Sequence, residues 1–126
     1  MNYRTAIILC GGKGTRLGEL GKKLPKTLVK IQGKPILWYI LKTLKKNGFN
    51  HFILPIGYRG KQIEEFIKNN QIQGCKIIVV KTGINTSIAK RIYKIKDFLF
   101  SQNFLILNGD AIFDANLDEI FKKHTL

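Results

Sequence analysis

Four short runs of almost entirely apolar residues divide the chain, and stretches with helical spacing lie between them. The runs span residues 5–10, 51–56, 76–80 and 104–107. A continuous apolar run of this length predicts a strand that is buried on both faces, as in a parallel sheet covered by helices. Strands that alternate with helices predict βαβ units with right-handed crossovers. We therefore expect an α/β fold with a mainly parallel sheet.

The stretches between these runs predict four helices. The first has an apolar stripe with lysines on its other face, a proline in its first turn and a glycine after its end. Its stripe consists of Ile36, Leu37, Ile40, Leu41 and Leu44, preceded by Pro35 and followed by Gly48. Shorter stripes mark a second helix (Ile63, Phe66 and Ile67) and a third (Ile88, Ile92, Ile95 and Leu99). A capping box of Asn116 and Glu119 predicts a fourth helix, with Leu117, Ile120 and Phe121 facing inward.

The first predicted strand leads directly into a glycine-rich loop, residues 11–17. Glycines in this loop let backbone N–H groups approach an anion closely. Thr15 adds a hydroxyl donor, and Arg16 adds a planar guanidinium that suits phosphate oxygens. The loop does not match the dinucleotide fingerprint, because Leu17 stands where a glycine is required, and it lacks the Gly-Lys-Ser/Thr of a P-loop. It nevertheless lies beyond a strand's carboxyl end, where ligands bind in such folds.

Two further elements strengthen the prediction of a phosphate site. In Leu24-Pro25-Lys26, the proline restricts the local backbone and the lysine can place a compact charge over the loop. The fourth strand ends in Asn-Gly-Asp, where the glycine opens space for a ligand. Asp110 then stands at the strand's carboxyl end, where it is placed to hold Mg²⁺ as one of the few protein carboxylates that this metal needs.

These three elements, LCGGKGTRL, LPK and LNGD, resemble in order and spacing the motifs of the sugar-1-phosphate nucleotidyltransferases. The stretch IQGKPILWYILKTLKKNGFNHFILPIGYRGKQIEEF is also similar to the family's segment between its nucleotide-binding elements, so the resemblance covers essentially the whole chain. It implies a Rossmann-like three-layer fold. Residues 1–126 would form the nucleotide-binding, N-terminal part of the catalytic domain, truncated at the C-terminus.

The resemblance favours CTP and leaves the acceptor open. Residues 81–92 (KTGINTSIAKRI) are similar to the TGxxTxxxxR stretch of the glucose-1-phosphate cytidylyltransferases. LNGDAIFD instead resembles the form found in the heptose- and mannose-1-phosphate guanylyltransferases, which keeps GTP as the alternative. The chain departs from the glucose enzymes at Ala89, Lys90 and Ala111. Another phosphorylated acceptor is therefore an open alternative, for example that of the similar phosphoglutamine cytidylyltransferases of capsule phosphoramidate synthesis.

The resemblance implies transfer of CMP from CTP to a phosphorylated small molecule, with release of pyrophosphate, for capsule or surface polysaccharide precursors. Arg16 and Lys26 are implied as catalytic residues and Asp110 as the Mg²⁺ ligand. The implied nucleotide-binding residues are Leu9, Gly11, Gly12, Gly14, Thr15, Arg16, Lys26, Thr86 and Arg91. Later segments usually supply a second metal ligand and the acceptor site in this family, so this chain alone is expected to bind nucleotide weakly and to be inactive.

The composition keeps one function of another class in view. Lys and Arg number 22 against 8 Asp and Glu, a net charge of +14, which raises nucleic-acid binding as a hypothesis. The cations are spread along the chain and do not alternate with aromatic residues, so no nucleic-acid partner is predicted. A non-catalytic nucleotide-binding domain is the other alternative, against which Asp110 argues.

The remaining features predict an ordinary globular chain. No apolar run approaches about 20 residues, so no membrane span is predicted, and the short N-terminal stretch is not a signal peptide. We expect a cytoplasmic protein, with homo-oligomer formation left open. Cys10 and Cys75 are expected as reduced, buried thiols, and His51 and His124 as isolated histidines without a catalytic role.

Overall fold

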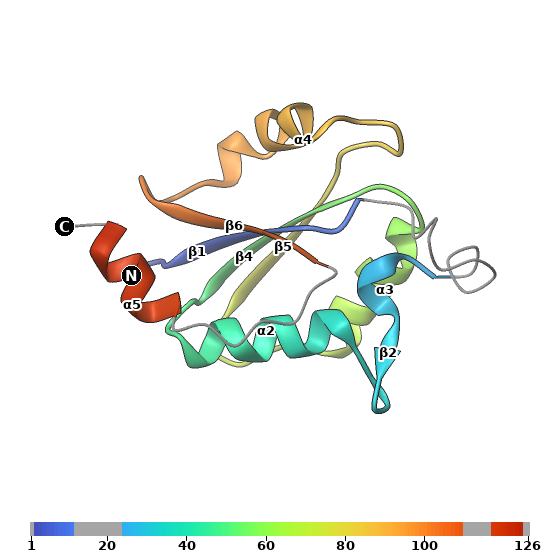
Figure 1. Ribbon diagram of the computed structural model, residues 1–126. Coiled ribbons are helices and arrows are strands. Elements are labelled where there is room, and N and C mark those ends of the chain that lie inside the picture. The colour runs from blue at the N-terminus through green and yellow to red at the C-terminus, as the bar shows by residue number, and fades with distance from the viewer. Residues whose placement is uncertain (1, 12–23, 110–116, 125–126) are drawn as a thin grey trace.

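The computed structural model describes residues 2–11, 24–109 and 117–124, and its elements alternate between strands and helices (Figure 1). The strands are β1 (Thr5–Leu9), β2 (Lys30–Ile31), β3 (Lys34–Pro35), β4 (His51–Ile56), β5 (Lys76–Lys81) and β6 (Phe104–Asn108). The α-helices are α2 (Ile36–Lys46), α3 (Gly60–Asn69), α4 (Ile88–Lys94) and α5 (Leu117–His124), and the 3-10 helices are η2 (Lys26–Leu28) and η3 (Lys96–Phe98).

The main sheet has four strands in the order β5-β4-β1-β6, and every neighbouring pair is parallel. Helices α2 and α3 cover one face, whereas α4 and η3 cover the other (Figure 1). The predicted three-layer α/β fold with a mainly parallel sheet is confirmed. The antiparallel pair β2–β3 was not predicted; its turn places Gln32 and Gly33 at φ 50° and 84°, as a tight hairpin turn requires.

Strand β1 is buried on both faces, which explains its continuous apolar sequence. Ala6 and Ile8 belong to the core beneath α2 and α3, while Ile7 belongs to the core beneath η3. Strand β4 repeats this alternation, with Phe52 and Leu54 toward α2 and Ile53 toward η3. All of these side chains have 0% exposure. Neither face of β1 or β4 is therefore exposed to solvent, as is typical of strands inside a parallel sheet.

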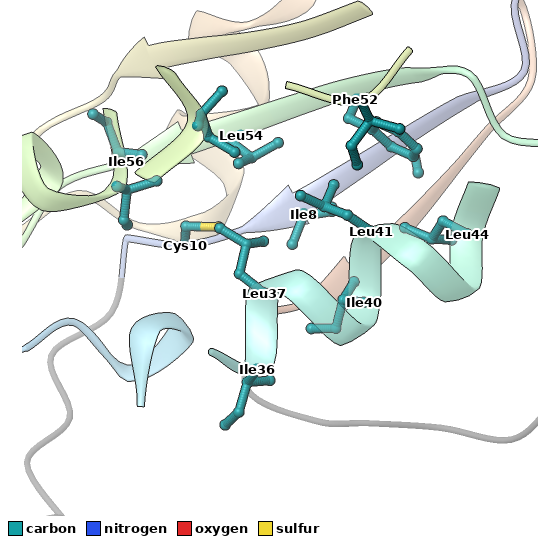
Figure 2. Packing of buried hydrophobic residues seen from close by; sticks show 14 of the residues in the cluster. Ile8, Cys10, Ile36, Leu37, Ile40, Leu41, Leu44, Phe52, Leu54 and Ile56 are labelled. Atoms are coloured by element: carbon teal, nitrogen blue, oxygen red, sulfur yellow. The ribbon is translucent and has the colours of Figure 1, made fainter. Parts of the chain in front are cut away.

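Helix α2 contributes five buried apolar side chains to the core, and Figure 2 shows Leu37 and Leu41 on the side of the helix that faces β1 and β4. The whole predicted stripe is buried: Ile36, Leu37, Ile40, Leu41 and Leu44. Burial of such a side chain contributes roughly 1.5–3 kcal/mol relative to exposure. Pro35 precedes the helix as its N-cap, one residue outside the predicted first turn.

The end of α2 depends on Gly48, as the sequence predicts. Gly48 has φ 87° and its N–H donates to the Lys45 carbonyl at 3.0 Å. The N–H of Phe49 donates to the Leu44 carbonyl at 3.0 Å, which completes a Schellman motif with its usual apolar contact. This turn directs the chain from α2 into β4.

Two predicted helical stripes differ from the structure. The third predicted helix is interrupted, since α4 ends at Lys94 and η3 follows, and Ile88 is 57% exposed. The interruption lets Ile95 and Phe98 pack onto the sheet. Helix α5 docks through Phe121, whose ring lies 5.3 Å from that of Phe49, whereas Ile120 is 53% exposed. Ile120 was therefore wrongly predicted to face inward, and Asn116 lies outside the described residues.

Arg4 anchors α5 to the rest of the structure. Its guanidinium donates to the Asn47 carbonyl at 2.8 Å and to the Asp118 carboxylate, and lies 4.9 Å from the centre of the Phe121 ring. The Arg4 hydrogen bond is the main reason why the pKa of Asp118 lies below its ordinary value.

No helix within the described ranges has the length and apolar character that crossing a bilayer requires.

His51 is fully buried at the amino end of β4 and is held neutral there. Its Nδ1 lies 2.9 Å from the Thr5 hydroxyl, its ring stacks on Phe100, and its Nε2 has no partner among the described residues. Burial, and then the positive charge of Lys76, lowers the pKa of His51. A neutral histidine in this position would resist protonation only as long as the fold persists.

The free energy of unfolding is therefore predicted to fall on acidification. Below about pH 6.5, His51 binds a proton in the unfolded chain but not in the folded one. The free energy of unfolding then falls by up to about 1.4 kcal/mol for each pH unit of acidification. Urea unfolding at a series of pH values measures this slope. His51→Phe should flatten it, whereas His124→Gln, at an exposed position on α5, should leave it unchanged. An equal slope in His51→Phe and the parent chain would contradict the assignment.

Candidate functional site

The candidate site is a cavity of about 320 Å³ beyond the carboxyl ends of β1 and β6. The chain passes from β1 outward to β4 and β5, and returns on the other side of β1 as β6. This reversal is a topological switch point, where open α/β sheets bind their ligands. The cavity is lined by Leu9, Cys10, Gly11, Lys26, Thr27, Ile84, Thr86, Ile88, Arg91, Asn108 and Gly109.

Gly109 allows the end of β6 to approach η2 and β1. Its N–H donates to the Leu9 carbonyl at 3.0 Å, and a Cβ on it would lie 3.0 Å from that carbonyl oxygen and against the Thr27 methyl group. A larger residue would therefore separate the strand end from η2. Close packing against the Leu9 carbonyl and Thr27 thus explains why a glycine stands at this position of the predicted Asn-Gly-Asp motif.

Lys26 lies on the cavity wall because Pro25 begins η2 beside the strand ends. Pro25 has φ −66° and ψ 152°, and its carbonyl accepts the N–H of Leu28 at 3.0 Å. Thr27 and Leu28 are buried by this turn, which leaves Lys26 half-buried on the lining. The flexible side chain of a lysine can follow an anionic ligand from such a position.

Arg91 is a buried cation on the opposite wall, only 6% exposed. Its Nε donates to the Thr86 carbonyl at 3.0 Å, and its Nη1 donates to the Thr82 hydroxyl at 2.7 Å. Its Nη2 donates to the carbonyls of Ile84 at 3.1 Å and of Gly11 at 3.4 Å. Burial lowers the pKa of Arg91, but a guanidinium stays charged in proteins.

The turn that Arg91 holds is itself a hydrogen-bonded unit. The Thr86 hydroxyl donates to the Thr82 carbonyl at 2.6 Å, and the Lys94 ammonium donates to the same carbonyl at 3.0 Å. Gly83 has φ 97°, which side chains rarely adopt, and the Thr86 hydroxyl occupies the space beside it. The spacing of Thr82, Gly83, Thr86 and Arg91 in the sequence therefore corresponds to one folded unit.

Cys10 lines the cavity without the properties of a nucleophile. Burial raises the pKa of its thiol to about 12, and the nearby Thr27 hydroxyl offsets only part of this effect. The thiolate needed for attack is therefore negligible at neutral pH. Cys10 is buried as predicted, whereas Cys75 is half-buried, and both thiols are free.

All described residues that were predicted for the site lie on this one cavity: Leu9, Gly11, Lys26, Thr86 and Arg91. The other predicted residues, Gly12, Gly14, Thr15, Arg16 and Asp110, lie outside the described residues. Sequence reasoning missed Thr27, Ile84 and Ile88 as lining residues. Only the proximity of Thr27 to the Pro-Lys pair could have indicated it, and nothing in the sequence marks the two isoleucines, which are 53% and 57% exposed.

The charged residues on the described part of the lining are both cations, Lys26 and Arg91. A site of this kind attracts an anionic ligand, and it combines these charges with apolar side chains and close-packed glycines. Within the described residues, no group of three or more His, Cys, Asp or Glu side chains is placed to hold a metal ion. The arrangement suits a phosphate-bearing molecule with an apolar or planar portion.

Comparison with known proteins identifies similar sequences along almost the whole chain. A family profile described as "Nucleotidyl transferase" matches residues 5–126. A probable glucose-1-phosphate cytidylyltransferase of Bacillus subtilis (strain 168) is 37% identical over 94% of this chain and 55% of its own length. A D-glycero-alpha-D-manno-heptose 1-phosphate guanylyltransferase of Campylobacter jejuni is 38% identical over 91% of this chain and 51% of its own length.

The fold is likewise found among solved structures. A putative glucose-1-phosphate thymidylyltransferase from Bacillus anthracis superposes with a TM-score of 0.86 at 22% identity, over 97% of this chain and 50% of its own. This likeness supports the Rossmann-like architecture. The chain spans about half the length of each of these three relatives.

Gly109→Ala is predicted to destabilise the chain by about 1–3 kcal/mol, because the added methyl group meets the Leu9 carbonyl and Thr27. Gly74→Ala is the matched comparison. Its Cβ would enter open space, so only the left-handed backbone at φ 81° opposes it, by about 1–2 kcal/mol.

Urea unfolding measures both changes, and ligand binding separates them. Gly109→Ala should also weaken the binding of a phosphate-bearing ligand at the cavity, whereas Gly74→Ala should not. Equal effects of the two variants on binding would contradict the packing role of Gly109.

Proposed function

Because this chain belongs to the nucleotidyl transferase family, we propose that it binds CTP beyond β1 and β6 and supplies the nucleotide-binding part of a CMP transfer. The acceptor in this proposal is a phosphorylated small molecule, such as a sugar 1-phosphate or phosphoglutamine. The main supporting observation is that Leu9, Gly11, Lys26, Thr86 and Arg91 line one cavity at the switch point of the sheet. Synthesis of capsule or surface polysaccharide precursors fits this chemistry.

The proposed reaction is a displacement at the α-phosphorus of the nucleotide. An oxygen of the acceptor phosphate forms a bond to this phosphorus, and the bond to the bridging oxygen of the β-phosphate breaks. Pyrophosphate leaves with the electron pair of the broken bond. Reactions of this type depend on positioning and on neutralisation of phosphate charge, for which a cavity bearing two cations is suited.

The predicted residues other than Arg91 have the following roles in this proposal. Lys26 contacts the α-phosphate and the acceptor phosphate, and Arg16 neutralises charge on the leaving pyrophosphate. The backbones of Leu9 and the glycine-rich loop, including Gly11, Gly12 and Gly14, lie against the base, ribose and phosphates. Thr15 and Thr86 add hydroxyl groups. These roles use the donor types that stabilise developing charge in transition states.

The proposed metal is Mg²⁺, which would supply neutralisation of phosphate charge. Asn108 and Gly109 line the cavity, and their oxygen atoms are of the type that Mg²⁺ prefers. The two charged residues of the described lining are cations, so a carboxylate must come from elsewhere. Asp110, the next residue in the sequence, is the ligand that we propose.

A second candidate is guanylyl transfer to heptose or mannose 1-phosphate. The 38% identity to the heptose 1-phosphate guanylyltransferase favours it, whereas the Thr82–Arg91 unit and the cytidylyltransferase relative favour CTP. The two candidates share the reaction and differ in the base.

Thermal unfolding with each of CTP, GTP, dTTP, UTP and ATP, with Mg²⁺ present, tests the proposal. A ligand that binds only the native state at about 100 times its Kd adds about 2.7 kcal/mol to the free energy of unfolding. CTP is expected to raise Tm most. A largest shift with GTP would replace the cytidylyltransferase by the guanylyltransferase, and no shift with any nucleotide would refute nucleotide binding by this chain.

Lys26→Ala is predicted to raise the Kd of the bound nucleotide about tenfold or more, because a charge-assisted contact to phosphate is lost. Lys30→Ala removes the same charge from the exposed strand β2 and should change the Kd by less than about twofold. Isothermal titration measures both constants. Equal weakening by the two variants would assign the effect to net charge instead of to the Lys26 contact.

A further inference from the structure

The hydrogen bonds of Arg91 are nearly all directed to the protein itself. A guanidinium has five N–H groups. Four hydrogen bonds run from its Nε, Nη1 and Nη2 to acceptors in the described chain, which are the Thr82 hydroxyl and the carbonyls of Gly11, Ile84 and Thr86. All three of its nitrogen atoms are therefore engaged by the protein. The Arg91 side chain therefore connects two loops by hydrogen bonds in the absence of a nucleotide.

These bonds connect the ends of three parallel strands. Gly11 follows β1, and Thr82 and Ile84 follow β5. The Thr82 hydroxyl, which accepts from Arg91, donates in turn to the Ile56 carbonyl at the end of β4, at 3.0 Å. The amide of Thr82 donates to the same carbonyl at 2.9 Å. Arg91 thus links the start of the glycine-rich loop to the turn on the opposite cavity wall.

Two glycines make room for this guanidinium. A Cβ on Gly11 would collide with the Arg91 guanidinium, and a Cβ on Gly57 would lie 3.0 Å from its Nη1 and against the Gly83 carbonyl. The guanidinium therefore packs against bare backbone from two other loops. No ion pair joins it to a carboxylate within the described ranges, so neutral carbonyl and hydroxyl dipoles are what hold it there.

We infer that Arg91 is a positioning residue that sets the distance between Gly11, after the end of β1, and the turn of residues 82–86, and so shapes the cavity before the nucleotide binds. This inference deepens the proposed function and rests on it for the identity of the ligand. In this role the planar, forked geometry of arginine matters more than its charge, because its donors reach acceptors of two loops in fixed directions. Direct contact with the nucleotide is secondary.

Variants of the 126-residue chain separate position from charge. Arg91→Lys retains the charge and removes the planar fork, whereas Arg91→Met retains the length and removes the charge. Lys90→Met is the matched control, since it removes the same charge from the neighbouring, exposed position on α4. Thr82→Val leaves Arg91 in place and removes the hydroxyl that links it to β4.

The first readout needs no ligand. Amide hydrogen exchange at position 82 and at Cys10, whose N–H donates to the Pro55 carbonyl at 3.2 Å, reports on the two loops. Both Arg91 variants are expected to accelerate exchange at both amides about tenfold or more, with a smaller increase in Thr82→Val and none in Lys90→Met. Unchanged exchange in the Arg91 variants would overturn the inference.

The second readout is the Kd of the nucleotide that most stabilises the parent chain. Arg91→Lys and Arg91→Met are both expected to raise it by about tenfold or more, while Lys90→Met stays within about twofold. A Kd retained in Arg91→Lys and lost in Arg91→Met would show that charge alone matters, and would overturn the positioning role.

The two proposals can fail separately. If the parent chain binds no nucleotide, the proposed function fails, while amide exchange still decides whether Arg91 joins the loops. If neither Arg91 variant folds, Thr82→Val decides instead. Faster exchange at Cys10 in that variant supports coupling between the loops, and parental exchange there overturns it.

Discussion

The burial of β1 on both faces is the constraint on which the rest of the structure depends. Ala6 and Ile8 require a layer of helices on one side, and Ile7 requires another layer on the opposite side. With β4 and β6 as its two parallel neighbours, β1 can meet a ligand only at its ends, and the cavity lies at its carboxyl end. The cavity therefore lies where the central strand leaves the core, and its glycines and cations are arranged around that point.

Much of this architecture could be predicted because long apolar patterns report burial directly. The four strands of the main sheet and the stripe of α2 follow from such patterns. The prediction was weaker where few contacts decide the structure. Strands β2 and β3 have two residues each and are too short for any alternation to appear. Ile120 was misplaced because α5 is held by Arg4 and Phe121 and not by a broad apolar stripe.

Motifs in the sequence pointed to some of the residues that line the cavity, but not to the interactions between them. Motif spacing indicated Lys26, Thr86 and Arg91, which the fold brings to one cavity. A sequence pattern does not state whether a cation faces a ligand or the protein. For Arg91 that answer depends on carbonyl groups from loops far apart in the chain, so it emerges only from the folded backbone. The positions of Ile84 and Ile88 also emerge only from the folded chain. They are exposed on the cavity lining, whereas an apolar residue is ordinarily expected in the core.

The pairing of β1 with β6 has a consequence for how the chain matures during synthesis. Thr5 pairs with Phe104, so among the four strands of the main sheet β1 is synthesised first and its edge toward β6 stays unpaired until β6 has been synthesised. Strands β4 and β5 can join β1 earlier, since domains begin to fold from the N-terminal end during translation. Because pairings between distant segments form slowly, the cavity at the ends of β1 and β6 is expected to form after the β5-β4-β1 part of the sheet.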